Sequence, residues 1–315
     1  MFLWRSAYGP WGLIGCGSTM PFVEHVLAVD IGGTKIEVGI VGVDGTIVDR
    51  RRAPSTDVAD AEVLFVRLTE LLDEVAAHPS MSSVGVCGVG CGGPMRQAGE
   101  AVSPINIPVW RDFPLRTRLA EHTGLAVHVD NDAKALALGE AWKGRARGVA
   151  NFIGMVVSTG VGGGIVLDGR LLDGTHGNAG HIGHVVVEPE GTQLDTHVQG
   201  VLEAEVSGTG IAARTGRSAE AADEAERIRA GRLVGRAVGS IANLLDLRLA
   251  VVAGSVALGF GDTFFAAAQV EIDRVADLQH SKGTIIAPAE LGADGPLIGA
   301  AAVGLRGEGH DVGVR

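Results

Sequence analysis

The feature that most constrains the fold is a pattern of three short strands that occurs twice along the chain. In the first copy, an apolar run rich in β-branched residues, 26–29, predicts a buried strand that stops at Asp30. Gly32-Gly33 follows as a turn, residues 36–41 predict a second strand, and Asp44-Gly45 predicts a hairpin turn before a third strand. The unit therefore consists of two successive hairpins, and the turn of the first contains Gly32-Gly33.

The second copy lies between residues 151 and 171 and has the same design. One strand runs into Ser158-Thr159-Gly160, glycines at positions 162–164 follow, a second strand reaches Leu167, and Asp168-Gly169 marks another hairpin turn. An internal repeat of this kind predicts two similar lobes. Two such turns that face each other can hold one polyphosphate between them.

The first glycine turn carries the groups that a phosphate and its cation require. Its backbone N–H groups can approach an anion closely, the Thr34 hydroxyl can donate, and Asp30 can hold Mg²⁺ through water. Taken alone, this copy could also be an ordinary glycine-rich hairpin. The second copy favours a nucleotide site, whose candidate contacts are Asp30, Gly32, Gly33, Thr34, Lys35, Thr159, Gly160 and Gly162.

These turns resemble the phosphate loops of the actin-like, sugar-kinase-type ATPase fold. More narrowly, they resemble those of the ROK family of sugar kinases and sugar-responsive repressors, over roughly residues 26–305 and with the motifs in family order. The resemblance implies an α/β, two-lobe actin-like (RNase H-like) fold with a ligand cleft between the lobes. It also implies ATP with Mg²⁺ near Asp30, a sugar substrate and a homodimer. Gly254-Ser255 resembles the family's Gly-Gly turn, with Ser in place of the second Gly, so the resemblance implies a contact with adenosine there.

A second centre follows the next apolar strand, at Asp130-Asn131-Asp132. Asn131 can cap the following helix, but a cap leaves Asp132 unexplained. A carboxylate at a sugar-binding turn can take the proton from an attacking hydroxyl, which contributes typically ~10²–10⁴-fold to the rate. The family's catalytic aspartate lies in an Asn-Asp-Ala-Asn motif, which this segment resembles, with Lys134 in place of the last Asn. The resemblance therefore implies that Asp132 is the general base.

The resemblance also assigns the other sugar contacts. Asn106 lies in a segment similar to the family's Asn-Leu-Pro-x-Trp, although it could be a turn-forming residue. ROK kinases usually carry Glu-x-Gly-His where this chain has His181-Ile-Gly-His184. Neutral imidazole offers one donor and one acceptor in place of a carboxylate, and histidine also occurs there in some bacterial N-acetylmannosamine kinases. The implied sugar contacts are Asn106, Asn131, Asp132, His181, His184 and Glu203, with structural, buried roles for the two histidines as the alternative.

The structural zinc of the family is expected to be absent. In the family, the histidine of this motif and three downstream cysteines hold the metal. Other residues stand at the three cysteine positions here: Leu194, Thr196 and Val201. Zinc needs four N, S or O ligands, and Leu and Val cannot serve. A makeshift site is the alternative, with His184, Asp195 and His197 as its ligands. Without a metal, residues 189–199 must be held by packing or be mobile.

Several helices are expected between the strands. Residues 57–78 predict an amphipathic helix, whose core-facing positions would be Val63, Val66, Leu71 and Val75. Residues 219–247 predict helices with a break near Gly231, and residues 295–303 predict a closing helix that returns to the first lobe.

Length and charge limit the alternatives. At ~150 residues per domain, 315 residues give about two domains. We expect an N-terminal lobe over 26–130, joined by about 296–315, and a C-terminal lobe over 131–295. Residues 1–25 are expected to be a disordered or mis-annotated extension, because Pro and Gly interrupt the apolar core that a signal peptide needs.

The net charge of −11, without a basic run, argues against nucleic acid as a partner. No apolar run reaches the ~18 residues of a membrane span. The three cysteines give no disulfide framework and indicate a reducing compartment, so we expect a cytoplasmic protein.

The sequence predicts an ATP-dependent kinase for the 6-hydroxyl of a hexose or N-acetylhexosamine, of the glucose or N-acetylmannosamine type. Two alternatives are a catalytically weak sugar-binding relative and a sugar-responsive transcriptional regulator without its DNA-binding domain.

Overall fold

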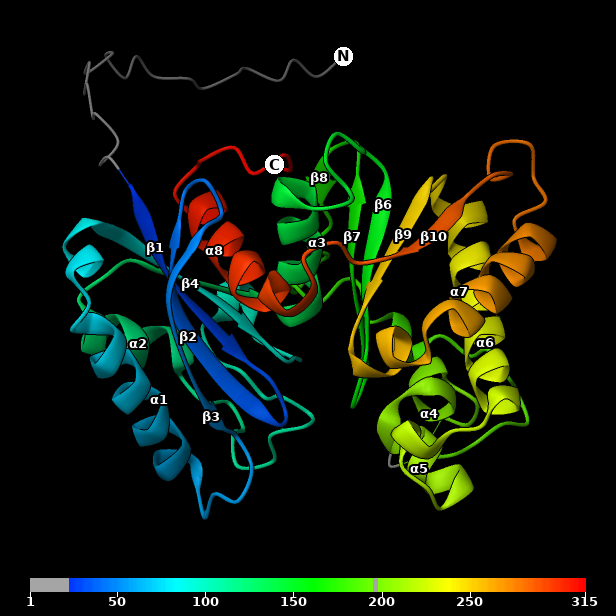
Figure 1. The fold of residues 1–315 in the computed structure, drawn as a ribbon, viewed down its shortest axis with the longest axis horizontal. Helices are drawn as coiled ribbons and strands as arrows, with labels where there is room; N and C mark the ends of the chain where they lie inside the picture. Colours follow the sequence, from blue (N-terminus) through cyan, green and yellow to red (C-terminus); the bar gives the residue numbers. More distant parts are fainter. Residues whose placement is uncertain (1–22, 195–197) are drawn as a thin grey trace, which may run out of the picture.

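The computed structural model describes residues 23–194 and 198–315. It consists of five layers side by side: outer helices, a sheet, a central pair of helices, a second sheet and further outer helices (Figure 1). We call the half around the first sheet the first lobe and the half around the second sheet the second lobe. Residues 1–22 of the predicted extension lie outside the described residues, so that prediction stays a prediction.

The first sheet has the strand order β3-β2-β1-β4-β5. β1, β2 and β3 pair antiparallel, whereas β4 and β5 run parallel to β1. The carboxyl ends of β1, β4 and β5 therefore lie at the same edge of the sheet. The register places Asp30 beside Gly90 and Gly90 beside Asp130. The strands are β1 His25–Ile31, β2 Lys35–Gly42, β3 Ile47–Pro54, β4 Val84–Cys91 and β5 Val127–Asn131.

The second sheet repeats this topology in the order β10-β9-β6-β7-β8, with β6, β7 and β8 antiparallel and β9 and β10 parallel to β6. Gly45 and Gly169 adopt φ values of 90° and 67°, as Asp-Gly hairpin turns require. The predicted internal repeat is therefore confirmed. The strands are β6 Phe152–Val157, β7 Val161–Leu167, β8 Arg170–Leu171, β9 Leu249–Ala253 and β10 Ile285–Pro288.

Helices cover both outer faces and fill the space between the sheets. α1 and α2 cover the outer face of the first sheet, α6 and α7 that of the second, and α3 and α8 lie between them (Figure 1). The helices are α1 Ala61–Ala76, α2 Leu115–Thr123, α3 Asp132–Lys143, α4 Leu202–Val206, α5 Gly208–Thr215, α6 Glu224–Leu245, α7 Ser255–Val275 and α8 Gly295–Gly307.

The two central helices cross at glycines. A Cβ atom on Gly139 of α3 would lie 3.0 Å from the Cα of Gly299 in α8, and one on Gly299 would lie 2.5 Å from the carbonyl oxygen of Ala135. α3 packs on β6 and β7 of the second sheet, and α8 packs on β1 and β4 of the first. This crossing therefore joins the two lobes.

α1 buries only part of the face predicted: Leu71 and Val75 are buried, whereas Val63 and Val66 are not. Asp60 caps the helix by accepting a hydrogen bond from the Val63 amide at 2.9 Å. Val63 and Val66 are 42% and 51% exposed, so their assignment to the core was wrong. The buried apolar stripe begins at Leu64, one residue after Val63, and its members have helical spacing. Its members are Leu64, Phe65, Leu68, Leu71, Leu72 and Val75.

The predicted helix break near Gly231 was also wrong. α6 continues through this residue without interruption, because the glycine serves packing: a Cβ atom there would clash with the carbonyl oxygen of Phe264 in α7. The irregular position lies in α7, where Gly261 has φ 60° and ψ −145°. A glycine in a helix can therefore indicate either close packing or a kink. Only the position of the neighbouring helix distinguishes the two roles.

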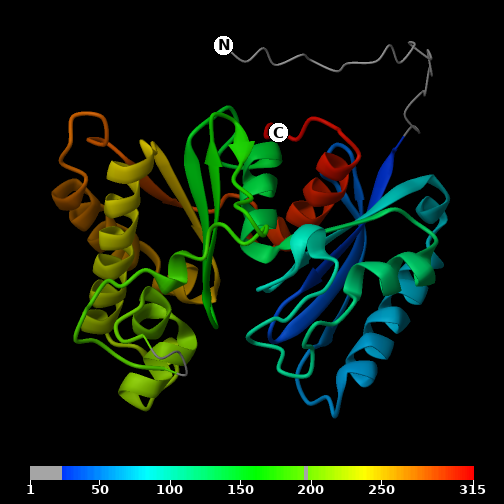
Figure 2. The ribbon, with the colours of Figure 1, turned by 180° about the vertical axis from the view of Figure 1, so that it is seen from behind.

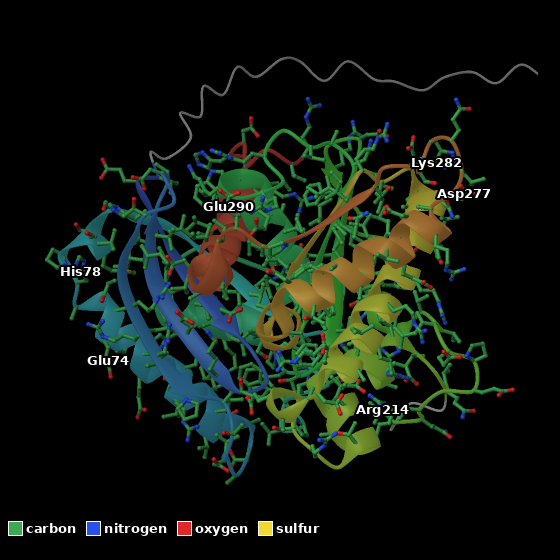
Figure 3. All side chains as sticks on the ribbon, turned by 45° about the vertical axis from the view of Figure 1, so that its right-hand side comes forward. Glu74, His78, Arg214, Asp277, Lys282 and Glu290 are labelled. Carbon is green, nitrogen blue, oxygen red and sulfur yellow. The ribbon has the colours of Figure 1, made fainter. Side chains whose placement is uncertain are left out.

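Charged side chains occupy the outer surfaces of the molecule. Glu74 and His78 project from the first lobe, and Asp277 and Lys282 form a 2.9 Å ion pair at the far edge of the second (Figure 3). In the part of the chain that the structure describes, no helix combines the length and the hydropathy needed to cross a bilayer.

Candidate active site

Two carboxylates from different elements meet at the end of the first sheet. Asp30 lies near the end of β1, and Asp132 is the first residue of α3, directly after β5. Gly90 of β4 lies between them: a Cβ atom there would be 3.6 Å from Asp30 Oδ1 and 3.8 Å from the Asp132 Cα. The absence of a side chain at Gly90 lets these two segments lie close together, and the charge of Asp132 acts on the Asp30 carboxyl group.

Burial changes the acidity of both groups. Asp30 is only 9% exposed, and burial, followed by the nearby charge of Asp132, raises its pKa from 3.8 to about 7. Burial also raises the pKa of Asp132, and the Glu203 carboxylate adds to this effect. Carboxyl groups with raised pKa values in one site are typical of acid–base chemistry or of a cation site.

Asp30 fits the predicted magnesium position. Among the described residues, its carboxylate forms no hydrogen bond or ion pair, although it is buried at the strand end. A buried carboxylate without a partner favours a bound cation, and Mg²⁺ prefers oxygen ligands with several retained waters.

Asn131 caps α3 as predicted. Its side-chain oxygen accepts a hydrogen bond from the Ala133 amide at 3.0 Å, which orients its amide nitrogen toward the turn after β4. A Cβ atom on Gly93 in that turn would lie 3.1 Å from Asn131 Nδ2 and 3.5 Å from His181 Cε1. The structure therefore brings Asn131 and His181 together around Gly93.

Asn106 and Glu203 meet at the second glycine turn. A Cβ atom on Gly160 would lie 2.8 Å from Glu203 Oε2 and 3.1 Å from Asn106 Nδ2. A Cβ atom on Gly33 would lie 2.7 Å from the Cβ of Asn106, so Asn106 is next to both glycine turns. Glu203 Oε2 also accepts a hydrogen bond from the Val161 amide at 2.7 Å, which fixes its carboxylate at this place.

The two histidines lie on one short 3₁₀ turn. Their ring centroids are 6.1 Å apart, His181 is half-buried and His184 is exposed. Burial and the neighbouring His184 lower the pKa of His181, while Glu203 acts in the opposite direction. His181 therefore presents a neutral imidazole, with one donor and one acceptor, toward Gly93.

The first predicted nucleotide turn is held by its own backbone. The Gly32 amide donates to the Lys35 carbonyl at 2.9 Å, and the Ser55 hydroxyl donates to the Gly32 carbonyl at 2.7 Å. Thr34 is exposed at its tip. The Lys35 ammonium pairs with the buried Glu37 at 2.7 Å, so this predicted contact points toward a carboxylate of β2.

The second predicted nucleotide turn meets the start of α7. The hydroxyls of Ser158 and Ser255 are 3.0 Å apart, and the Thr159 carbonyl accepts a hydrogen bond from the Thr209 hydroxyl at 2.9 Å. Gly254 has φ 103°, and a Cβ atom there would clash with the Val157 carbonyl oxygen, which requires glycine. The turn residues and Gly254-Ser255 thus share one edge of the second sheet.

A network of hydrogen bonds and ion pairs holds the segment at the expected zinc position. Glu205 of α4 is 0% exposed; it accepts a hydrogen bond from the Thr192 amide and pairs with Arg229 of α6. Arg236 of α6 donates to the Val187 carbonyl at 2.7 Å. The described part of this segment, up to residue 194, is therefore held by polar contacts.

The side chains here do not fit a zinc site. Leu194 and Val201 offer no ligand atom, and the described residues contain no group of three His, Cys, Asp or Glu placed to hold a metal. Asp195, Thr196 and His197 lie outside the described residues, so the makeshift site with His184 cannot be placed, and the absence of zinc stays a prediction.

Sequence reasoning missed the contact that joins the lobes behind the site. The loops after β4 and after β8 approach each other (Figure 2), where Asn178 forms two hydrogen bonds with the Met95 backbone. It also missed Lys134 of α3, whose ammonium donates to the Gly177 carbonyl. In both contacts the partners are far apart in sequence, 83 and 43 residues, so no short pattern links them.

Comparisons with known proteins agree with this geometry. A family model described as the ROK family matches residues 26–306. An N-acetylmannosamine kinase of Escherichia fergusonii is 35% identical over 251 residues, 75% of this chain and 84% of that protein. A glucokinase of Halalkalibacterium halodurans is 40% identical over 190 residues, 59% of this chain and 57% of that protein.

Solved structures extend the similarity over nearly the whole fold. The ROK hexokinase from Thermus thermophilus has a TM-score of 0.76 and 30% identity, covering 90% of this chain and 98% of that one. A ROK family glucokinase from Streptomyces griseus, in complex with glucose and AMPPNP, has a TM-score of 0.74 and 25% identity over 90% and 99% of the two chains. The predicted two-lobe actin-like fold is confirmed.

Proposed function

The chain belongs to the ROK family, and from this premise we propose that it is an ATP-dependent sugar kinase that phosphorylates the 6-hydroxyl of a hexose or N-acetylhexosamine. The observation that carries the proposal is the position of Asp132. Its carboxylate stands at the first residue of α3, beside the buried Asp30 and within the electrostatic reach of Glu203.

Asp132 is the general base. Its carboxylate takes the proton of the 6-hydroxyl as that oxygen attacks the γ-phosphorus, and the bond from the γ-phosphorus to the leaving ADP oxygen breaks. Because burial raises its pKa, the carboxylate is a stronger base than an exposed aspartate. Proximity and orientation supply much of the remaining acceleration.

The sugar is held between the loops that meet around Gly93 and Gly160. Asn106 and Glu203 orient it from the side of Gly160, and Asn131 and His181 orient it from the side of Gly93. His184 is exposed on the same 3₁₀ turn and completes the set. A neutral His181 can both donate and accept, which suits sugar hydroxyls as well as an N-acetyl carbonyl.

ATP lies along the two glycine turns. The first turn contributes Gly32, Gly33, Thr34 and Lys35, and the second side contributes Thr159, Gly160, Gly162, Gly254 and Ser255. Asp30 would hold Mg²⁺ through water, and the ion would neutralise charge on the phosphates. Closure of the lobes excludes water, which would otherwise compete with the sugar for the phosphoryl group.

Glucose and N-acetylmannosamine are the leading substrates. The relatives named above include a glucokinase and an N-acetylmannosamine kinase. His181, in place of the usual glutamate, favours the N-acetylated sugar. We therefore propose that N-acetylmannosamine should be tested beside glucose, mannose, fructose, allose and N-acetylglucosamine.

The test is ADP release with ATP and Mg²⁺ across these sugars, for the wild type and Asp132→Asn. Asp277→Asn, a surface change in the second lobe, is the matched control. Turnover on one sugar that falls by ~10²-fold or more in Asp132→Asn and is unchanged in the control supports the proposal. A sugar that raises the melting temperature without any ADP release would favour the weak sugar-binding relative instead.

A further inference from the structure

Lys134 is a buried cation in the first turn of the helix that begins with Asp132. It is 1% exposed, although lysine is rarely buried to this degree unless it is paired. It stands at the position of the last asparagine of the family motif that this segment resembles.

The ammonium of Lys134 joins three segments of the chain. It donates to Asp173 Oδ1 at 3.0 Å and to the Gly177 carbonyl at 2.9 Å, and it lies 3.5 Å from Asp130 Oδ1 at the end of β5. An ammonium has three N–H donors, and each can point at one of these oxygens. One side chain thus ties β5 and α3 to the loop that leads to His181.

This loop has little apolar packing of its own at that point. A cavity of about 290 Å³ adjoins it, and its lining includes Asp130, Lys134, Asp173, Gly174 and Gly177. Beyond Gly177, the next fixed points are Asn178, hydrogen-bonded to Met95, and Gly180, whose missing Cβ allows close contact with the Gly163 carbonyl. Polar contacts therefore hold the loop where packing does not.

We propose that Lys134 is a positioning residue for the sugar: its ammonium fixes the backbone at Gly177, and thereby the His181 imidazole, relative to Asp132 on the same helix. The inference rests on the proposed function, because it assigns His181 and Asp132 to one bound sugar. Lys134 thereby links Asp132, the proposed base, to the loop that carries His181. Asp132 and His181 do not provide this link by themselves.

The variants must separate positioning from simple stability. Removing the ammonium alone would leave Asp130 buried without its counter-charge, which is strongly destabilising. The charge-balanced pair Lys134→Met with Asp130→Asn avoids this problem. Lys134→Arg tests whether a longer cation rescues the effect, and Lys143→Met, at the other end of α3, is the matched control.

Steady-state kinetics on the preferred sugar give the first readout. In the charge-balanced variant, the KM for the sugar is expected to rise roughly 10- to 100-fold, as for one lost charge-assisted hydrogen bond. The KM for ATP should change less than about 2-fold, because the ammonium of Lys134 contacts Asp173, Gly177 and Asp130, none of which is a proposed ATP contact. Lys134→Arg should recover part of the loss, and Lys143→Met should behave as wild type.

Hydrogen exchange of the peptide over residues 173–181 gives a second readout that needs no turnover. Faster exchange there in the charge-balanced variant, with unchanged exchange over α6, supports the inference. An unchanged KM for the sugar with only a lower melting temperature would overturn it and leave Lys134 a structural residue. If the wild type neither binds nor phosphorylates any sugar of the panel, the proposed function itself fails, and the positioning role for the sugar fails with it.

Discussion

The side-chain amide of Asn178 pairs with the backbone of Met95 as a neighbouring strand would. Met95 N donates to Asn178 Oδ1 at 3.0 Å, and Asn178 Nδ2 donates to the Met95 carbonyl at 2.9 Å. The two residues are 83 positions apart and belong to loops of different lobes. Asn178 lies three residues before His181, and Met95 lies two residues after Gly93. His181 and Gly93 are next to each other in the site.

Asn178→Ala should weaken sugar binding, because it removes both hydrogen bonds between the loops. Two neutral hydrogen bonds correspond to a rise of roughly 10-fold in the KM for the sugar. Asn178→Asp should be at least as harmful, since a carboxylate oxygen would face the Met95 carbonyl. Asn151→Ala is the control, because Asn151 makes a similar side-chain contact with the Asp168 amide in a hairpin of the second lobe. Equal KM values for Asn178→Ala and wild type would contradict the prediction.

Asp30→Asn should stabilise the protein at pH 8. The pKa of Asp30 rises from 3.8 to about 7 in the folded protein, so between these values the folded state binds a proton that the unfolded state has lost. The free energy of unfolding therefore falls by ~1.4 kcal/mol per pH unit in this range. The raised pKa of Asp132 adds a contribution of the same sign.

Urea unfolding of wild type and Asp30→Asn from pH 4 to pH 8 measures this effect. The free energies of unfolding of the two proteins should be similar near pH 4 and should diverge as the pH rises. Above pH 7 the variant should be the more stable protein. The variant should also lose Mg²⁺-dependent ADP release. A constant difference across the pH range would show that ionisation of Asp30 does not cost stability.

Glu205→Gln should destabilise the segment that the family holds with zinc. Removing the buried carboxylate breaks the close ion pair with Arg229, leaves that guanidinium with Glu226 at 3.9 Å, and costs ~3 kcal/mol. Lys282→Met breaks the exposed pair with Asp277 and should cost less than ~1 kcal/mol. Thermal melts with and without EDTA complete the test: we expect no change with the chelator, whereas a large drop would indicate a bound metal.

Gly231→Ala should destabilise the protein although alanine favours helices. The added methyl group would clash with the Phe264 carbonyl and push α6 away from α7, at a cost of about 1–3 kcal/mol. Gly259→Ala is the matched control in α7, because a Cβ atom there meets nothing within 4 Å. It should gain up to ~1 kcal/mol. Melting temperatures that shift in the same direction for both variants would refute the packing role.

Features that depend on residues close in sequence could be predicted. The repeated strand units, the Asp-Gly hairpins and the Asn131 cap all follow from local turn and strand chemistry. The buried face of α1 could not be predicted reliably, because Val63 and Leu64 are both apolar and only the sheet beneath them decides which is covered.

Contacts between distant segments were beyond sequence reasoning. Lys134 lies 43 residues before Gly177, and Asn178 lies 83 residues after Met95, so no short pattern links the partners. The large increase in the pKa of Asp30 depends on burial and on Asp132, which the fold alone brings near it. A carboxylate at a strand end indicated a candidate site at Asp30, but it could not indicate the raised pKa of this group.

The glycine crossing of α3 and α8 has a mechanical consequence. Gly139 and Gly299 bring the backbones into contact without side chains that interlock. Sliding the lobes past each other, or pulling them apart here, would disrupt the apolar core around the crossing, which includes residues of both helices. We therefore expect the lobe closure of the proposed function to be a rotation about this crossing.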